Sequence, residues 1–512
     1  FPTRRSSDLS SVQTATIGAH ALDKSIIAGA IGLGIVFLLM LIFYGMLGLI
    51  ADIALLLYVI MFMWSMVGLG VVMTLPGIAA LILSIGMAVD ANVIIFARIK
   101  EEICAGKTIR VAVDAGFKNA LTTVLDAQIT TLIAAVVLYE IGTTSVKGFA
   151  LTLMIGIVIS IFTAVVITQL FISLLANNPK FAKNKYFGVN DDLTPKQMLN
   201  KTFSFIKHRK VYYIISCVII IAGLLFATIG GMNYGIDFTG GTMIEIEMGE
   251  QIDLGRVEDV LSETEIDGAV TYAGEGNTGI IIKTTDSLDN DQRATLLDAV
   301  KTEFSIDDEA VTSVSNIGPS VGNLLKKNAA KAIAISVVLM LIYIAVRFQW
   351  KYGLAAILAL ANTLLIVFGF YGLFHITINS PFIAAMLTIL GYGINDTIVI
   401  FDRIRENTGG AAKKNITALA PLVNAGIHQT LGRSIMTSLT TVIVMIPLLI
   451  ICGSTIRSFI LPLLVGVIAS TLSSIFIATS LWYDINRITE KRSYNGKSSK
   501  PAKKKVSKEP TV

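Results

Sequence analysis

Two stretches of the sequence repeat each other, and they decide the fold: residues 84–99 read SIGMAVDANVIIFARI, and residues 389–404 read ILGYGINDTIVIFDRI. In this alignment a glycine, a phenylalanine and an arginine of the first stretch fall on the same residue types of the second. Further along the chain, Lys147–Gly156 aligns with Arg457–Gly466 in the same way. Similarity that recurs in the same order along the chain indicates a duplicated structural unit.

The composition is that of a membrane protein. Of the 512 residues, 54% are hydrophobic and 15% are charged, whereas soluble domains carry about 25% charged residues. The three cysteines, Cys104, Cys217 and Cys452, are far apart and form no CxxC pair. Neither a disulfide framework nor a zinc site is therefore predicted.

Eleven stretches are long and apolar enough to cross a membrane as helices, which takes about 20 residues. They are predicted at residues 25–44, 48–66, 75–96, 128–145, 149–175, 211–230, 329–346, 353–373, 379–401, 433–452 and 456–482. Lys and Arg are concentrated in every second loop and in the C-terminal tail, with the loops being 97–118, 176–210, 347–352 and 402–432. The positive-inside rule then predicts a cytoplasmic C-terminus and places the long polar segment between the sixth and seventh spans outside the cell.

The chain divides into two parallel repeats and four connecting or flanking parts around a small domain. The predicted parts are a truncated or non-native N-terminus (1–16), a first five-helix repeat (17–176), a cytoplasmic linker (177–210), a single span (211–230), an external domain (231–328), a second five-helix repeat (329–485) and a basic cytoplasmic tail (486–512). The single span restores the orientation of the second repeat, so the repeats are parallel. A lost first span and a lost first external domain would complete the symmetry. The external domain alternates strand, helix, two strands, helix and strand, which predicts a ferredoxin-like fold.

Few charged side chains fall inside the predicted spans, where a charge is costly and marks a functional site by default. Asp90 and Asp396 lie about 10–12 Å deep in spans of the two repeats. Arg433 lies near the cytoplasmic start of its span, from which it could reach either acid. A neighbouring arginine favours the ionised form of a carboxyl group, so moving the arginine changes its proton affinity. Asp126, near a predicted cytoplasmic end, is expected only to cap a helix or to reach toward the interface.

These positions break the symmetry of the repeat. Asp90 aligns with Asn395, and Arg433 aligns with Thr123, so neither charge has a charged counterpart. Two acids and one arginine in a pseudo-symmetric bundle are the minimum parts of a proton relay. One alternative is a static buried ion pair that fixes helix register. Another is a Na⁺ site, to which further oxygen ligands would come from Asn92, Asn395 and Thr397.

Small residues near the acids, Gly86, Gly391 and Gly393, are expected to let spans 75–96 and 379–401 pack closely at a central interface. The sequence contains no Walker A motif, no nucleophile–base arrangement and no cluster of metal ligands. Neither an enzyme activity nor a cofactor is therefore predicted. The coupling ion would be H⁺, with Na⁺ as the alternative.

Long motifs around these residues carry a family resemblance. They are Leu75–Ala80 followed by Gly86–Val93, then Asn233–Thr242, then Gly391–Glu406. The chain resembles the SecD and SecF protein-export membrane proteins joined in one polypeptide, the SecDF form, within the resistance–nodulation–division superfamily. The resemblance implies a polytopic α-helical membrane protein with two parallel pseudo-repeats, about eleven transmembrane helices and one small external α+β ferredoxin-like domain.

The resemblance also implies a function in the bacterial plasma membrane. Members of this family are accessory subunits of the Sec protein translocase that use the proton motive force to promote late steps of export. Implied partners are the SecYEG translocon, the translocating polypeptide and the lipid bilayer, with YajC, YidC-type membrane proteins and SecA as further candidates, and no nucleic acid. By resemblance the family's two acids fall on Asp90 and Asp396, and its arginine falls on Arg433. Alternatives are a proton-driven exporter of lipids or small molecules on the same fold, and a scaffold of the translocon that transduces no energy.

Overall fold

The structure is a computed structural model that describes residues 9–13, 15–142, 144–190, 203–273, 278–307, 310–409 and 419–498. Within these ranges eleven helices are long and apolar enough to cross a membrane, which confirms the predicted number of spans. The first repeat contains α1 (Ala15–Tyr44), α2 (Met46–Gly68), α3 (Leu75–Cys104), α4 (Ile109–Ile141), α5 (Thr144–Phe162) and α6 (Thr168–Asn177). The connecting span is α7 (Arg209–Ile229). The second repeat contains α11 (Pro319–Arg347), α12 (Trp350–Leu373), α13 (Ser380–Thr408), α14 (Leu419–Ile451), α15 (Ser454–Leu472) and α16 (Thr479–Ser498).

Several helices extend well beyond the apolar stretches that predicted them. Helix α4 begins at Ile109 rather than at residue 128, and α14 begins at Leu419 rather than at residue 433. Hydropathy locates only the apolar part of a helix, because the polar turns beside it continue the same backbone hydrogen bonding. As a consequence, Arg433 lies well inside α14 and not near its start.

The duplication extends to an irregularity that the sequence did not reveal. The fifth span of each repeat is interrupted by a short π-helix, Thr163–Ile167 in the first repeat and Ser473–Ala478 in the second. These segments link α5 to α6 and α15 to α16. Single π-helical turns inside α-helices occur often at functional sites. Here they lie at matching places and face the two central helices of the bundle.

The two central helices, α3 and α13, begin in the same way. Thr74 caps α3 by accepting a hydrogen bond from the backbone N–H of Gly77, at 3.1 Å. Asn379 caps α13 by accepting from the N–H of Phe382, at 3.2 Å, and each helix has a proline in its first turn. A side-chain cap and an early proline favour a helix start. The most apolar 18 residues are 100% buried in α3 and 94% buried in α13, the highest values among the eleven spans.

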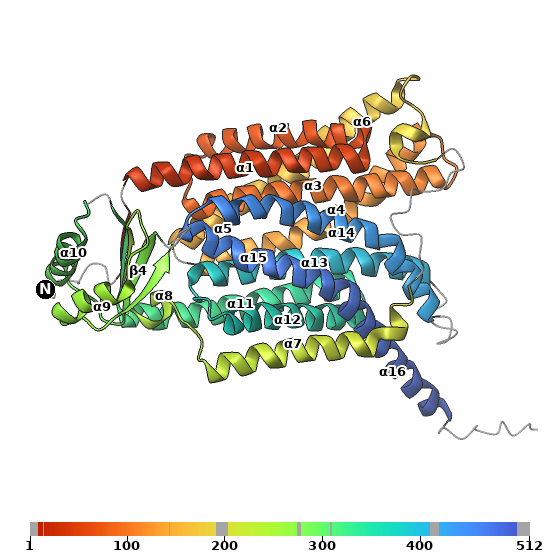
Figure 1. The fold of residues 1–512 in the computed structure, drawn as a ribbon. Helices are drawn as coiled ribbons and strands as arrows, with labels where there is room; N and C mark the ends of the chain where they lie inside the picture. Colours follow the sequence, from red (N-terminus) through yellow and green to blue (C-terminus); the bar gives the residue numbers. More distant parts are fainter. Residues whose placement is uncertain are drawn as a thin grey trace, which may run out of the picture.

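Each central helix is held by both repeats. Helix α3 packs against α4 and α5 of its own repeat and against α14 of the other, and α13 packs against α14 and α15 and against α4. Figure 1 shows these helices running side by side, with the small α/β domain at one end of the bundle. We call that end the domain side and the opposite end the far side. The exchange of α4 and α14 between the repeats places residues of both repeats around one site.

The α/β domain confirms the predicted order of strands and helices. Its elements are α8 (Ile236–Thr239), β2 (Gly241–Glu247), α9 (Leu254–Glu263), β3 (Ala269–Ala273), β4 (Gly279–Thr284), α10 (Asn290–Phe304) and β5 (Val311–Ile317). All neighbouring strands are antiparallel, and the order β5-β2-β4-β3 is that of a ferredoxin-like sheet. The core under α9 and α10 includes Ile244, Val257, Ile280 and Val300, which are buried because these residues alternate along the strands or recur on one helix face.

A further strand, β1 (Leu9–Gln13), pairs antiparallel with β5 at the edge of this sheet. The sequence predicted no element within residues 1–16, because a five-residue stretch with two adjacent serines has no clear hydrophobic pattern. Backbone pairing with β5 fixes its place instead. The strand leads into α1, so the sheet is joined to the first repeat as well as to the second.

A buried acid also joins the domain to the bundle. Glu245 on β2 accepts a hydrogen bond from the hydroxyl of Ser454, the first residue of α15, at 2.6 Å. Burial raises the pKa of the Glu245 carboxyl above its usual 4.5; the Ser454 hydrogen bond lowers it and the nearby charge of Glu247 raises it. Burial, the largest of these effects, therefore favours a proton on Glu245.

We expect the docking of the domain to weaken as the pH rises through this raised pKa. The docked carboxyl binds its proton more tightly than the undocked one, so the stabilisation is complete below the ordinary pKa and declines above it. Glu245→Gln should remove this pH dependence. Glu247→Gln removes only the negative charge that raises the pKa of Glu245, so it should make the pH dependence smaller. Hydrogen exchange of the first turn of α15, measured between pH 4 and pH 8, tests this. A pH profile unchanged by Glu245→Gln would contradict it.

Candidate functional site

The predicted acid of the first repeat is bound to its repeat-related residue in the second. The Asn395 side-chain amide donates a hydrogen bond to the Asp90 carboxylate, with Nδ2 2.5 Å from Oδ2. Both side chains are buried, with 4% and 7% of their surface exposed. The Asn395 Oδ1 atom is buried without a hydrogen-bond partner among the described residues. It offers an acceptor for a protonated Asp90, so the pair can accommodate either protonation state.

The predicted acid of the second repeat lies among hydroxyl groups. Asp396 is 6% exposed and accepts hydrogen bonds from Thr437 and Ser438 on α14 and Thr471 on α15, at 3.5, 3.4 and 3.3 Å. The hydroxyl oxygens of Ser438 and Thr471 lie 2.5 Å from each other. A hydroxyl group can donate to a carboxylate or accept from a carboxylic acid. The surroundings of Asp396 therefore fit a group that gains and loses a proton.

Arg433 interacts electrostatically with both acids but contacts neither. In the described part of the chain it has no ion pair within 4.0 Å, and its Nη2 atom is buried without a hydrogen-bond partner. Its charge interacts with those of Asp90 and Asp396 and also with those of Arg98 and Glu101. The structure therefore does not show the static ion pair that was the alternative to a relay. Arg433 is half-buried, and a guanidinium group without a fixed partner can exchange one acid for another.

The corresponding helix of the other repeat contains a fixed ion pair, about one turn from Thr123, the residue that aligns with Arg433. Asp126 on α4 accepts hydrogen bonds from Tyr343 and Arg347 on α11, both at 2.7 Å. Asp126 was expected to cap a helix or to reach toward the interface, and it forms this ion pair instead. Local pattern could not reveal the pair, because its partners lie more than 200 residues away in the sequence. The pair α4–α11 corresponds to α14–α1, where Arg433 interacts electrostatically with Tyr44. Asp126 of the first repeat is thus held in an ion pair with Arg347, whereas Arg433 of the second repeat has no direct partner among the described residues.

The remaining predicted polar residues face away from the two acids. The Thr168 hydroxyl donates to Asn92 at 3.0 Å, and Thr397 is 2.7 Å from the hydroxyl of Ser474. Each is thus bound to the fifth span of its own repeat, at or beside the π-helix. Of the three expected sodium ligands, only Asn395 contacts an acid. The described residues contain no group of three or more His, Cys, Asp or Glu side chains that could hold a metal ion.

The glycines near the acids allow close packing, but with helices other than those expected. A Cβ atom on Gly86 would lie 3.1 Å from Thr441 Cα on α14, and one on Gly391 would lie 2.9 Å from Thr131 Cα on α4. Gly393 faces Ser470 on α15. The central helices are instead bridged directly by the hydrogen bond between Asn395 and Asp90. The glycines bring α4, α14 and α15 up to the central pair.

The hydroxyl groups around Asp396 were missed by sequence reasoning that searched only for charges. A detectable signal exists, because Ser434, Thr437, Ser438 and Thr441 recur at helical spacing on one face of an otherwise apolar span. Such a polar stripe marks a face that does not contact lipid. Tyr392, whose hydroxyl lies 3.1 Å from that of Thr441 and which interacts electrostatically with both acids, belongs to the same polar interior.

On the far side, the ends of α3 and α13 are joined by a ring of four charges. Arg98 pairs with Glu101 and Glu406 at 3.0 and 2.9 Å, and Arg403 pairs with the same two acids at 3.0 and 2.8 Å. The two arginines are repeat-related, and so are the two glutamates. We call these four residues the charge ring. It closes the far side of the bundle beyond Arg433, which interacts with Arg98 and Glu101.

We expect the charge ring to stabilise the contact between the repeats moderately. Arg98 is 12% exposed while Glu406 is 42% exposed, so solvent and salt weaken their attraction. A double-mutant cycle with Arg98→Met and Glu406→Gln, followed by thermal unfolding in detergent, should give a coupling energy of about 1 kcal/mol. The value should fall at high salt. Strict additivity of the two substitutions at low salt would contradict this account.

Comparisons with known proteins show the family to which this fold belongs. A family described as "Protein export membrane protein SecD/SecF, C-terminal" matches residues 5–178 and 297–488, and the SecD/SecF GG motif matches residues 226–252. The protein translocase subunit SecDF of Bacillus subtilis is 37% identical over 494 residues, covering 94% of this chain and 66% of that protein. SecDF of Thermus thermophilus is 36% identical and is covered to 62%.

A solved structure has the same fold. The crystal structure of SecDF from Thermus thermophilus, described as a translocon-associated membrane protein, superposes with a TM-score of 0.85 at 34% identity, over 94% of this chain and 64% of that one. A second structure, SecDF in a super-membrane-facing form, gives a TM-score of 0.73 over the same shares. The chain spans less than two thirds of the length of these SecDF relatives. With both repeats and the GG motif matched, it belongs to the SecD/SecF family of protein-export membrane proteins.

Proposed function

We propose that the chain is an accessory part of the Sec protein translocase that uses the proton motive force to promote late steps of protein export across the bacterial plasma membrane. The observation that carries the proposal is the arrangement of Asp90, Asp396 and Arg433. Two buried acids from different repeats interact with one arginine that is fixed to neither. The related proteins named protein translocase subunit SecDF support the pathway.

In this proposal protonation changes which groups attract Arg433. A carboxylate on Asp90 or Asp396 attracts the guanidinium group, and a proton on that acid removes the attraction. Arg433 then turns toward the other acid or toward Glu101 of the charge ring. Because Asp90 is on α3, Asp396 on α13 and Arg433 on α14, each exchange changes the forces between helices of the two repeats. Alternate access of the acids to the two sides of the membrane would make these exchanges a proton path.

We propose that the α/β domain lies outside the cell and that the charge ring and the C-terminus lie in the cytoplasm. The loops rich in Lys and Arg are on the far side of the bundle, as the positive-inside rule requires of cytoplasmic loops. Protons driven inward would then enter from the domain side. The partners would be the SecYEG translocon and the translocating polypeptide, with YajC, YidC-type proteins and SecA as further candidates. The coupling ion would be H⁺; no covalent chemistry is part of this mechanism.

The test is export into membrane vesicles that carry the protein and its single variants Asp90→Asn, Asp396→Asn and Arg433→Met. The proposal expects export to be faster with an imposed proton gradient than without one, and expects each variant to lose this increase. Unchanged gradient-dependent export in all three variants would contradict it. Export that requires the protein but not the gradient would indicate a scaffold instead. Gradient-driven release of lipid or small molecules without any effect on export would favour an exporter.

A further inference from the structure

The segment that leads from α7 into the α/β domain is hydrogen bonded to the start of α13. The backbone N–H of Ile378 donates to the carbonyl of Asn233 at 2.8 Å, and the N–H of Gly235 donates to the carbonyl of Ile378 at 2.7 Å. The Asn233 side-chain amide donates to the Thr377 hydroxyl at 3.0 Å. This segment therefore runs beside the turn that precedes α13, as a short parallel bridge.

One side chain of the segment reaches the helix itself. The Asp237 carboxylate accepts a hydrogen bond from the backbone N–H of Ser380, with Oδ2 2.6 Å from the nitrogen. Ser380 is the first residue of α13. The helix already has its own cap, Asn379, which accepts from Phe382. Asp237 satisfies a second free N–H and places a negative charge at the positive end of the helix dipole. It joins the domain to the helix that carries Asp396.

The other end of the segment is wedged against α11. Gly240 and Gly241 have φ values of +77° and +117°, which residues with a Cβ atom rarely adopt. A Cβ on Gly240 would lie 2.8 Å from Pro319 Cα, and one on Gly322 would lie 3.0 Å from the Gly240 nitrogen. The two glycines thus let the backbone turn from α8 into β2 in direct contact with the start of α11. Gly240 and Gly241 lie within the stretch that matches the SecD/SecF GG motif. This backbone turn and its close packing require glycine at both positions.

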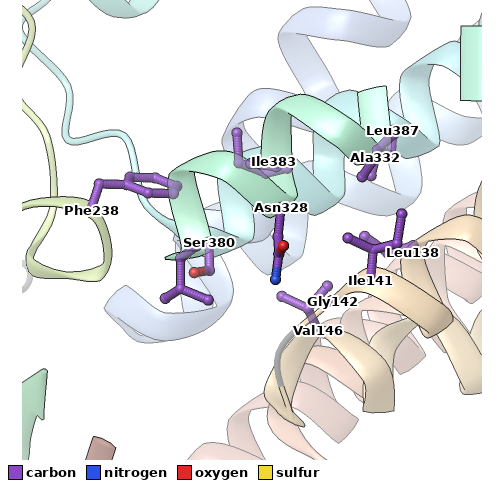
Figure 2. A pocket seen from close by; sticks show the side chains of 12 residues that line it. Leu138, Ile141, Gly142, Val146, Phe238, Asn328, Ala332, Ser380, Ile383 and Leu387 are labelled. Atoms are coloured by element: carbon purple, nitrogen blue, oxygen red, sulfur yellow. The ribbon is translucent and has the colours of Figure 1, made fainter. Parts of the chain in front are cut away.

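This segment, through Phe238, lies on one wall of a crevice between the repeats. Figure 2 shows Phe238 and Ser380 at one end of this crevice, with side chains of the second repeat facing those of the first across it. The lining is almost entirely apolar and includes Ile383 and Leu387 on α13 opposite Leu138 and Val146. Phe238, next to Asp237, and Ser380, the first residue of α13, thus line the same end of this crevice.

We propose that Asp237 is a positioning residue that couples α13 to the α/β domain, so that a displacement of α13 caused at Asp396 moves the domain directly. The inference rests on the proposed proton-driven function. Asp237 would be needed to convert proton movement into export but not for proton movement itself. A purely structural role would lower both activities together, which makes the two cases distinguishable.

The experiment compares Asp237→Ala with Asn379→Ala, measuring proton flux and gradient-dependent export on the same preparations. Both variants remove a cap from α13, but only Asp237→Ala also removes the side-chain bond from the domain to the helix itself, while the backbone bridge at Ile378 stays in both. We expect Asp237→Ala to lower export per proton about tenfold with its flux unchanged, and Asn379→Ala to lower neither. Normal export in Asp237→Ala, or an equal loss of flux and export, would overturn the inference without touching the proposed function. Loss of flux in Asp90→Asn remains the test of that function.

A cross-link tests the same link without removing it. Asn233→Cys and Thr377→Cys, introduced with the native cysteines replaced, place two thiols where side chains are hydrogen bonded. A disulfide there should leave export unchanged, because the segment and α13 are inferred to move as one body. Loss of export on oxidation, restored by reduction, would show that the two must separate and would overturn the inference.

Discussion

Asp396→Asn is expected to abolish the gradient-dependent part of protein export while the protein remains folded and in the membrane. The substitution keeps the shape of the side chain and removes the group that can carry a proton. Loss of a positioned acid–base group typically costs a factor of at least about 100 in the step that it serves. The Asn amide can still hydrogen bond to Thr437, Ser438 and Thr471, so the three helices should stay in place. Gradient-dependent export that persists in this variant would contradict the role of Asp396.

The groups around Asp396 provide graded controls. Ser438→Ala and Thr471→Val each remove one hydrogen bond longer than 3.2 Å, so each should reduce the proton-dependent step only partly. Thr397→Val changes the next residue on the same helix, whose hydroxyl faces Ser474 and not the acid. It should leave the step unchanged. If Thr397→Val reduced the proton-dependent step as much as Asp396→Asn does, the loss would reflect a general sensitivity of α13 to substitution. It would then say nothing about the carboxyl group of Asp396.

Arg433→Met and Arg347→Met are expected to have opposite effects. Arg433 has no direct partner in the described part of the chain, so its removal should change thermal stability little and should abolish gradient-dependent export. Arg347 holds Asp126, which is 10% exposed. Its removal should lower the free energy of unfolding by about 2 kcal/mol, because a buried carboxylate loses its charged partner. Export per folded molecule should be retained.

Thermal unfolding in detergent and export in vesicles, measured on both variants, test the contrast. The result that would contradict it is the reverse pattern, in which Arg433→Met unfolds the protein and Arg347→Met uncouples it. Comparable losses of stability in both would show that Arg433 is a structural charge. In that case the absence of a fixed partner would have no functional meaning.

The sequence predicted the large features of the fold because they depend on local composition. Eleven apolar stretches and the periodic pattern of the α/β domain are visible without tertiary contacts. The helix starts at Ile109 and Leu419 were not, since polar turns carry no hydropathy signal. Strand β1 was missed because only its pairing with β5 defines it.

The site shows the same division. Asp90, Asp396 and Arg433 were found because a charge in an apolar span is costly, and the bond between Asp90 and Asn395 follows from their repeat-related positions. The partners of Asp126 could not be predicted, because α4 and α11 are brought together only when the repeats pack. Gly86 and Gly391 indicated close packing, but a small residue does not identify the helix that it faces.

The central claim is that the two acids form a path for protons, and proton flux tests it most directly. Liposomes containing the protein and no sodium are given an inward proton gradient, and the internal pH is followed with a trapped dye. We predict flux with the unchanged protein and less than about a tenth of it with Asp90→Asn or Asp396→Asn. Flux that appears only when sodium is added, or that is equal in the unchanged protein and both variants, would contradict the account.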